Sequence, residues 1–439
     1  MNTIGPIVRV TSAEVHINDI DSYNTIFKVG TKFAKSQRYY DGPTSTGESV
    51  IDLRDFHGAH LRRSALQPYF SKQTVRKLEG LVQSKVDLFL TRLTEKLGST
   101  INLSRGFRCV TADIITTYSY ERCFEALDHP TFSPDWMIAF EDLIRSANLI
   151  VTLPKLVACI DWLFANVISK DLAMMISPNL AHSRDFEDRC KDAVFDQKKR
   201  WMAGERNMVT VFEQLFQDDE KKGRKAATDA QLTGEANLMV AAGMDTTGHT
   251  LTLAAYNLIK YPSAEKKLLQ ELKTVMSEPR SEVSEETAQN LPYLQACIKE
   301  SLRFSLGVAQ PLARDVPIST GATILGHKLP PGTTTMNSHY IYHMNPKVFP
   351  DPEKWDPERW LVDDTKEMEN YFMPFSRGAR ICIGLNLAWA ELSLVLARVV
   401  RRFELSYAED FKDENMEWGA FFIPVTKGLL TVTMKERSE

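Results

Sequence analysis

The sequence predicts one mainly α-helical domain with small β-sheets near its two ends. Helical periodicity dominates from about Arg62 to Phe304, and short β-like runs lie near both ends of the chain. No repeat, low-complexity tract or linker rich in Gly, Ser and Pro divides the 439 residues. Hydrophobic residues make up 43% and charged residues 25%, an ordinary globular balance. We therefore expect residues 1–439 to form a single domain.

The individual elements can be placed from periodicity and from helix stop signals. Strands are expected at residues 7–10, 14–17, 322–325 and 429–434. Helices are expected at residues 73–97, 233–260, 264–276, 291–304 and 385–402. Pro262 fits a stop after the second of these helices. The last helix is apolar on most faces, which predicts that it is buried.

Charge and cysteine content argue against several classes of protein. A net charge of −4 is too small to indicate a nucleic-acid partner. The six cysteines are scattered without a CxxC pair, which favours neither a zinc site nor a disulfide framework. No GxGxxG motif opens a βαβ unit, so any electrons from a nucleotide must come through a separate protein.

The segment 375–384 holds the one cysteine with an unusual neighbourhood. Cys382 lies between Gly378 and Gly384, immediately before the helix expected at 385–402. A helix N-terminus presents unpaired N–H groups and a partial positive charge, which lower the pKa of a thiol. The glycines allow a flat ligand to approach the backbone, and Arg380 could reach an anionic group on it. The competing interpretation is a buried structural cysteine at a helix start.

Phe375, Gly378, Arg380, Cys382 and Gly384 together resemble the haem-ligating signature of the cytochromes P450. The resemblance implies the fold of that family, with haem b between the long central helix and the helix that follows the cysteine. It also implies that Cys382 is the axial thiolate ligand of the iron. A thiolate ligand favours cleavage of the O–O bond of bound dioxygen.

The middle of the helix 233–260 agrees with this resemblance. Gly and Thr in a buried helix interior reduce stability, so Gly243 and Thr246 call for an explanation. Thr246 can bond the carbonyl four residues back, which with Gly243 would open a local bulge. In the family this is the oxygen-binding groove, so Thr246 would hold dioxygen and its water, and Asp245 would feed protons inward. A helix with incidental Gly and Thr is the alternative.

Glu300, Arg303 and Arg359 resemble a structural part of the family. Glu300 and Arg303 stand at i and i+3 on one helix face, a pattern that alone indicates only a solvated surface pair. Arg359 lies in the segment 349–360, which resembles the family's segment before the cysteine loop. The resemblance implies a buried cluster of the three side chains that locks the haem-binding core.

The resemblance also places two arginines near the haem propionates. Arg63 fits the arginine of the family's third long helix, and Arg314 is a third anion contact after Arg380. Four residues before Arg63 the family has an aromatic residue or His, whereas this chain has Ala59, with His57 and His60 nearby. We therefore expect one propionate contact to be lost or moved.

The front of the chain departs from eukaryotic members, which carry a membrane helix before the first strand. The N-terminus has no signal-peptide pattern, and no window is apolar enough to span a membrane. We expect the anchor to be missing. The family implies the cytosolic face of the endoplasmic reticulum, or the cytoplasm if this short form is genuine. The apolar stretch Leu149–Ile168 predicts either a core helix or a peripheral membrane contact.

Residues 5–9 and 386–392 look most like fungal members of secondary-metabolite pathways, including monooxygenases of the trichothecene type. The resemblance implies a monooxygenase that uses O2 and electrons from NADPH–cytochrome P450 reductase. Its substrate would be a small lipophilic molecule, a terpenoid or polyketide intermediate that is hydroxylated, epoxidised or desaturated. A haem-thiolate isomerase or dehydratase, and an inactive truncated haem-binding form, are the alternatives. The pair Asp245 and Thr246 favours the monooxygenase, because a proton relay serves dioxygen activation.

Two surface features complete these expectations. The Val308–Ala309 turn and the Gly419–Phe422 tip are candidates for substrate contact, because both lie near the haem in relatives. A basic stretch suits an acidic redox partner, with a solvated helix face as the alternative. It consists of Arg62, Arg63, Lys72, Arg76 and Lys77.

Overall fold

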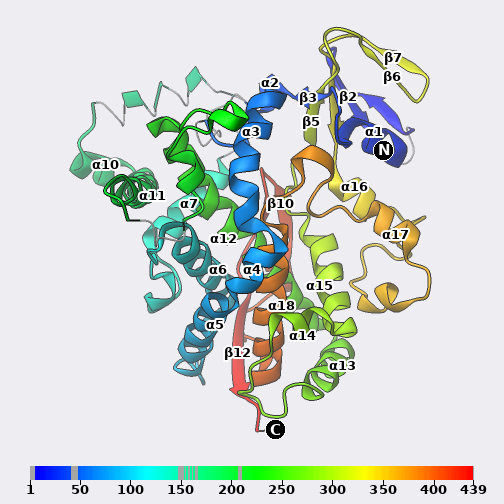
Figure 1. The fold of residues 1–439 in the computed structure, drawn as a ribbon. Helices are drawn as coiled ribbons and strands as arrows, with labels where there is room; N and C mark the ends of the chain where they lie inside the picture. The colour runs from blue at the N-terminus through cyan, green and yellow to red at the C-terminus, as the bar shows by residue number, and fades with distance from the viewer. Residues whose placement is uncertain are drawn as a thin grey trace.

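The computed structural model describes residues 5–40, 48–146, 167–205 and 210–438, and residues 153, 155–156, 159–160 and 162–163 between them. Within this part of the chain the fold is mainly α-helical with small separate sheets, as the sequence predicts. Figure 1 shows the helices α12 and α18 in the middle of the molecule, with the largest sheet at one end.

The central helix α12 (Asp229–Lys260) begins four residues before its predicted start. The Thr228 hydroxyl accepts from the Gln231 N–H, and the Gln231 side chain accepts from the Thr228 N–H. This capping box satisfies two N–H groups that would otherwise lack partners, and so fixes where the helix begins. Helix α12 packs against α6 (Leu103–Tyr120), α15 (Pro292–Ser305) and α18.

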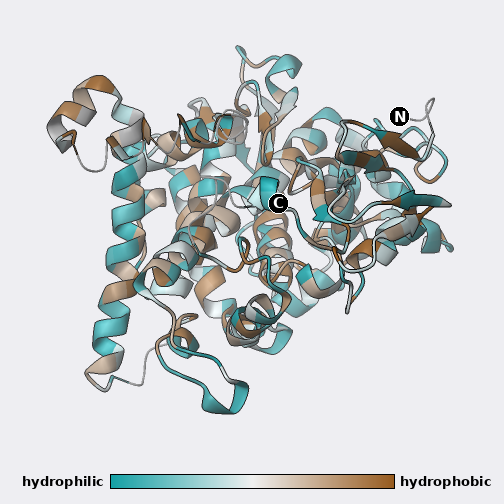
Figure 2. Ribbon diagram, turned by 90° about the horizontal axis from the view of Figure 1, so that it is seen from above, coloured by the Kyte–Doolittle hydropathy of each residue, from teal (hydrophilic) through white to brown (hydrophobic). Residues whose placement is uncertain are grey.

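Helix α18 (Leu385–Arg402) has the predicted bounds. Gly384 is its N-cap residue, and most side chains from Leu387 to Arg401 are buried. Figure 2 shows hydrophobic residues concentrated on the inner helices, in agreement with the burial of α18. The cysteine loop is therefore joined directly to a helix that the core holds in place.

The other helices surround these two. Their bounds are α1 (Ile20–Phe27), α2 (Gln37–Tyr40), α3 (Phe56–Leu66), α4 (Lys72–Lys77), α5 (Glu79–Thr94), α7 (Asp135–Arg145), α10 (Lys170–Ile176), α11 (Pro178–Met202), α13 (Pro262–Lys273), α14 (Glu285–Gln289), α16 (His339–His343) and α17 (Lys366–Tyr371). The single helix predicted at 73–97 is wrong, because α4 and α5 are separate. The Leu78 N–H bonds to the Val75 carbonyl three residues back, which tightens the turn and ends α4.

The largest sheet joins the N-terminal strands to two strands that follow α15. Its strand order is β1–β2–β8–β5–β3, with bounds β1 (Ile7–Arg9), β2 (Glu14–Ile17), β3 (Ala34–Lys35), β5 (Leu312–Asp315) and β8 (Thr334–Asn337). Strands β3 and β5 are antiparallel, and Lys35 pairs with Arg314. Strands β1, β2 and β3 precede α3 in the chain, and β5 and β8 follow α15. Together they form one layer beside the cysteine loop.

Two hairpins and a three-stranded sheet make up the rest of the β-structure in the described residues. The hairpins pair β6 (Ala322–Ile324) with β7 (His327–Leu329), and β10 (Trp418–Ala420) with β11 (Pro424–Thr426). The sheet has the order β4–β12–β9, with bounds β4 (Ile101–Asn102), β9 (Phe403–Tyr407) and β12 (Thr431–Glu436). The runs predicted at 322–325 and 429–434 are confirmed as strands.

Much of the apolar stretch Leu149–Ile168 lies outside the described residues. Most of its large hydrophobic side chains that are described are exposed, among them Leu156, Trp162 and Val167. Helix α10, which follows, also exposes Met175 and Ile176, and it lies beside α11 at the edge of the molecule (Figures 1 and 2). No helix within the described ranges is long and apolar enough to cross a membrane.

Candidate active site

The loop that carries Cys382 is tied to the helix that follows it. The Cys382 N–H donates to the Phe375 carbonyl at 2.9 Å, and the short helix η6 (Gly378–Arg380) lies between these two residues. The Phe375 ring packs against Trp389 of α18, with ring centroids 6.2 Å apart. Backbone and ring contacts together therefore fix the position of the sulfur relative to α18.

Gly378 allows helix α1 to approach this loop closely. Its φ of 70° is in the left-handed region, where a residue with a Cβ is strained. A Cβ at this position would lie 1.7 Å from the carbonyl oxygen of Phe27, the last residue of α1. Glycine is therefore required here by conformation and by packing, independently of any ligand.

Opposing effects act on the pKa of the Cys382 thiol. Burial raises this pKa, whereas the Gly384 N–H and the nearby Arg63 guanidinium lower it, and burial is the largest effect. The effect of burial on this pKa therefore outweighs the lowering that the helix N-terminus alone predicts. The side chain nevertheless remains accessible. Coordination to a metal ion deprotonates a thiol even in such surroundings.

Three arginines near this cysteine have no acidic partner among the described residues. Arg63 comes from α3, Arg314 from β5 and Arg380 from η6, and none of them forms an ion pair with a described residue. Burial, Arg314 and Arg63 together lower the pKa of Arg380 to about 10. Arg314 is 4% exposed, with its guanidinium 4.7 Å from the centre of the Phe27 ring. Such a group of cations repels itself and favours a bound anion.

Thr246 and Gly243 occupy the middle of α12. The Thr246 hydroxyl donates to the Ala242 carbonyl at 2.8 Å, as the sequence predicts. Helix α12 nevertheless stays α-helical throughout, so the predicted bulge is not observed. Gly243 instead serves helix packing, since a Cβ there would lie 2.7 Å from Ile115 of α6. The Ala242 carbonyl accepts from the Thr246 hydroxyl and also keeps its hydrogen bond within the helix. The helix therefore needs no inserted residue and forms no bulge.

Asp245 lies against α6 and α7. Its carboxylate is 2% exposed and forms an ion pair with Arg108, with Nε and Oδ1 2.6 Å apart. Arg108 also pairs with Glu141 at 2.6 Å. Burial raises the pKa of Asp245, and Arg108 opposes this rise. Consecutive residues point about 100° apart on a helix, so Asp245 and Thr246 do not share a face.

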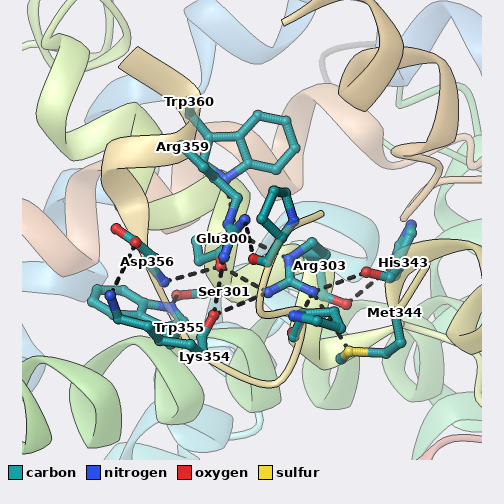
Figure 3. Close-up of polar contacts among 12 residues, drawn as sticks. Glu300, Ser301, Arg303, His343, Met344, Lys354, Trp355, Asp356, Arg359 and Trp360 are labelled. Carbon is teal, nitrogen blue, oxygen red and sulfur yellow. Dashed lines mark hydrogen bonds and ion pairs between the residues drawn. The ribbon is translucent and has the colours of Figure 1, made fainter. Parts of the chain in front are cut away.

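Glu300, Arg303 and Arg359 form the buried cluster that the sequence predicts (Figure 3). Arg303 donates to both Glu300 oxygens, at 2.8 and 3.0 Å. Arg359 Nε and Trp360 Nε1 donate to the same carboxylate, at 3.0 and 2.9 Å. The second guanidinium edge of Arg303 donates to the carbonyls of His343 and Pro352. The cluster thus joins α15 to the end of α16, at His343, and to the segment 352–360, both of which precede the cysteine loop.

A model of the cytochrome P450 family matches residues 1–432. The chain belongs to the cytochrome P450 family. It is 31% identical to cytochrome P450 monooxygenase penB of Penicillium thymicola, over 97% of this chain and 95% of that protein. It is 30% identical to cytochrome P450 monooxygenase aflU of Aspergillus parasiticus (98% and 85% covered) and to cytochrome P450 monooxygenase TRI4 of Fusarium sporotrichioides (93% and 78%). The predicted family and its fungal type are confirmed.

Membership of the cytochrome P450 family implies a haem-thiolate cofactor and makes the chain an oxidoreductase. The residues at this site fit that cofactor. Cys382 offers an accessible sulfur, and Arg63, Arg314 and Arg380 offer cations without acidic partners for two propionate groups.

The expectation that one propionate contact is lost or moved in this P450 stays a prediction, and it concerns Ala59 and the two nearby histidines. Ala59 is 2% exposed and carries no polar atom in its side chain, while His57 and His60 are exposed. Another residue near the arginines, Lys35 of β3, gave no signal in the sequence. It lies within a short strand without a recognisable motif, and only pairing with β5 places it beside Arg314.

The basic stretch predicted for a redox partner is only partly a surface feature. Arg62 is buried and donates to Glu235 of α12 at 2.8 Å. Burial raises the pKa of Glu235 to about 7, and Arg62 opposes this rise. Arg76 is half exposed, with Glu285 and Glu286 at 3.7 and 3.4 Å. Sequence alone could not identify the Arg62–Glu235 pair, because its members are 173 positions apart.

The two segments expected to contact substrate lie together in this P450. The Ala309 and Gln310 N–H groups both approach the Phe422 carbonyl, at 3.2 and 3.4 Å. The turn after α15 and the tip of the β10–β11 hairpin therefore form one surface. Its contact with substrate stays a prediction.

Proposed function

We propose that this P450 is a haem-thiolate monooxygenase that oxidises a small lipophilic biosynthetic intermediate, either a terpenoid or a polyketide. The observation that carries the proposal is the group of arginines without acidic partners beside Cys382, in a chain of this family. Bound haem would supply the activation of dioxygen. The similarity to fungal monooxygenases supports hydroxylation, epoxidation or desaturation as the reaction type.

The cofactor would be held by residues from three segments of the chain, namely α3, β5 and the cysteine loop. Cys382 would be the iron ligand, and Arg63, Arg314 and Arg380 would bind the propionates. The positions of Gly378 and Gly384 on either side of the sulfur support this assignment. Phe375 would hold the loop through its contact with α18.

Thr246 and Gly243 would line the oxygen side of the cofactor. Ala242 and Thr246 are partly or fully accessible, whereas Met244 and Asp245 are buried against α6, which supports this orientation for Thr246. The Thr246 hydroxyl would hold a water molecule and pass on its proton. Asp245 would supply protons only when its carboxylate leaves Arg108, since the ion pair holds it on another face.

Electrons would come from NADPH–cytochrome P450 reductase. Lys72 and Lys77 are the exposed part of the predicted basic stretch that remains for this partner. The exposed side chains of Trp162, Met175 and Ile176 would make a peripheral contact with a membrane, through which lipophilic substrate enters. We propose the cytosolic face of the endoplasmic reticulum as the location.

The first test is the absorption spectrum of the reduced, carbon-monoxide-bound protein. We expect the band typical of thiolate ligation, and Cys382→Ala should abolish it. Cys297→Ala is the matched control, because that cysteine is buried in α15 and should leave the band unchanged. A spectrum typical of histidine-ligated haem in the unmodified protein would refute the assignment of Cys382.

The second test separates a monooxygenase from an isomerase or dehydratase. Turnover of metabolites extracted from a fungal host should require both oxygen and NADPH with reductase, and product formed without oxygen would refute monooxygenation. Thr246→Ala should consume NADPH while forming less product. The control is Thr233→Ala, because that hydroxyl bonds the Asp229 carbonyl in the same way at the far end of α12. An inactive haem-binding form would show no turnover under any of these conditions.

A further inference from the structure

Lys35 and Arg314 form an unfavourable pair of like charges within the largest sheet. They are directly opposite in the antiparallel pairing of β3 with β5, so their side chains leave the same face. Both are buried, at 7% and 4% exposure. Like charges that face each other across strands are destabilising, and burial increases the repulsion. Something in the functional protein should offset this repulsion.

The two side chains share a small enclosed pocket beside the cysteine loop. Apart from Thr31 its lining is apolar or positively charged, and it contains no acidic residue: Ile26, Phe27, Thr31, Phe33, Lys35, Phe56, Arg314, Arg377, Ala379 and Arg380. Arg377 is engaged by Asn24 at 2.8 Å and Asn370 at 3.2 Å. Lys35, Arg314 and Arg380 are left to face the pocket with their charge unopposed by any lining residue.

All three arginines of the proposed propionate site act electrostatically on Lys35. Burial is the largest effect that holds the pKa of Lys35 well below its usual range, followed by Arg314 and Arg380, with a smaller effect from Arg63. Asp52 opposes these effects but does not cancel them. The Lys35 ammonium donates to the Ile51 carbonyl and lies 4.5 Å from the centre of the Tyr40 ring. These contacts use part of its donor capacity, since an ammonium has three N–H donors.

We propose that Lys35 binds a propionate carboxylate of the haem, in place of the side chain that Ala59 does not provide. A carboxylate in this pocket would neutralise the cross-strand repulsion between Lys35 and Arg314. It would also explain why the chain keeps a buried lysine among three arginines. The inference rests on the proposed haem site. It assigns one propionate contact to Lys35 of β3 instead of to position 59 of α3.

The test is the rate at which the purified holoenzyme loses haem to excess apomyoglobin. Lys35→Met keeps the length of the side chain and removes its charge, and it should lose haem about tenfold faster because a charge-assisted hydrogen bond is lost. Lys35→Arg should lose haem at nearly the unmodified rate. Lys32→Met is the matched control, since Lys32 lies three residues earlier and is exposed, and its rate should not change.

A second measurement separates a direct contact from a general effect on folding. The resonance Raman band of propionate bending should shift in Lys35→Met and return in Lys35→Arg. Faster haem loss with an unchanged band would overturn the proposal, because Lys35 would then act only on the fold. A haem-loss rate for Lys35→Met equal to that of the unmodified protein would also overturn it. The carbon-monoxide spectrum of the unmodified protein is read separately, so failure of the Cys382 assignment is distinguishable from failure of this one.

Discussion

Two groups of buried arginines differ in what balances their charge. Arg303 and Arg359 share the carboxylate of Glu300, and the remaining donors of Arg303 are taken by backbone carbonyls (Figure 3). Arg314 and Arg380, beside the cysteine loop, have no carboxylate within ion-pair distance in the part of the chain that the structure describes. The protein thus completes one group with its own atoms and leaves the other incomplete.

The difference indicates what each group is for. A buried charge is tolerated when it is paired and hydrogen-bonded, so the Glu300 cluster can serve the fold alone. A buried group of like charges raises the energy of the protein and is retained where a ligand supplies the opposite charge. Loss of an arginine should therefore weaken the fold in the first group and weaken cofactor binding in the second.

The largest expected effect is the loss of Arg303. Arg303→Met would leave Glu300 buried with Arg359 as its one remaining cation, and breaking a buried pair costs about 3–5 kcal/mol in free energy of unfolding. Urea unfolding of the holoenzyme should show this loss. Arg76→Met is the control, because its half-exposed pairs with Glu285 and Glu286 should contribute no more than about 1 kcal/mol. Equal effects of the two substitutions would contradict the comparison.

Another buried arginine, Arg62, pairs with Glu235 and allows the effect of a buried ion pair on stability to be measured as a function of pH. Burial raises the pKa of its partner Glu235 from 4.5 to about 7, so between these values the folded protein holds a proton that the unfolded chain has released. Stability from this group is therefore present at low pH and is lost as pH rises to about 7. At about 1.4 kcal/mol per pKa unit, the loss reaches about 3 kcal/mol.

Glu235→Gln cannot ionise, so its stability should not fall across this window. The free energy of unfolding of the variant, measured in urea at several pH values, should rise relative to the unmodified protein from pH 4.5 to 7. The difference should level off above about pH 7. Parallel stability curves for the two proteins would show that Glu235 does not titrate in this range.

The smallest expected effect is on cofactor retention. Arg380→Met removes one cation from a group that repels itself, so the protein should unfold in urea at nearly the unmodified concentration once haem is saturating. Haem transfer to apomyoglobin should nevertheless be about tenfold faster, since one charge-assisted hydrogen bond to a carboxylate is lost. A large loss of stability without faster haem loss would place Arg380 with the structural arginines instead.

The sequence determines the cysteine loop and the central helix, and the buried Glu300 cluster follows from the resemblance to the family. The signals of the loop and the helix are residue types at short fixed spacings, such as the glycines on either side of Cys382. Short spacings are fixed by local backbone geometry, which does not depend on the rest of the fold. The bounds of α18 agree with prediction for the same reason, because a glycine cap and an apolar pattern are local signals.

Only the tertiary structure decides which distant residues meet. The ion pair of Asp245 with Arg108, the role of Gly243 in packing on Ile115, and the pairing of Lys35 with Arg314 all join separate elements. Sequence spacing carries no information about such contacts, because helix packing and strand register bring them about. The motif thus identifies the cysteine, while the packing of α3, β3 and β5 decides which cations surround it.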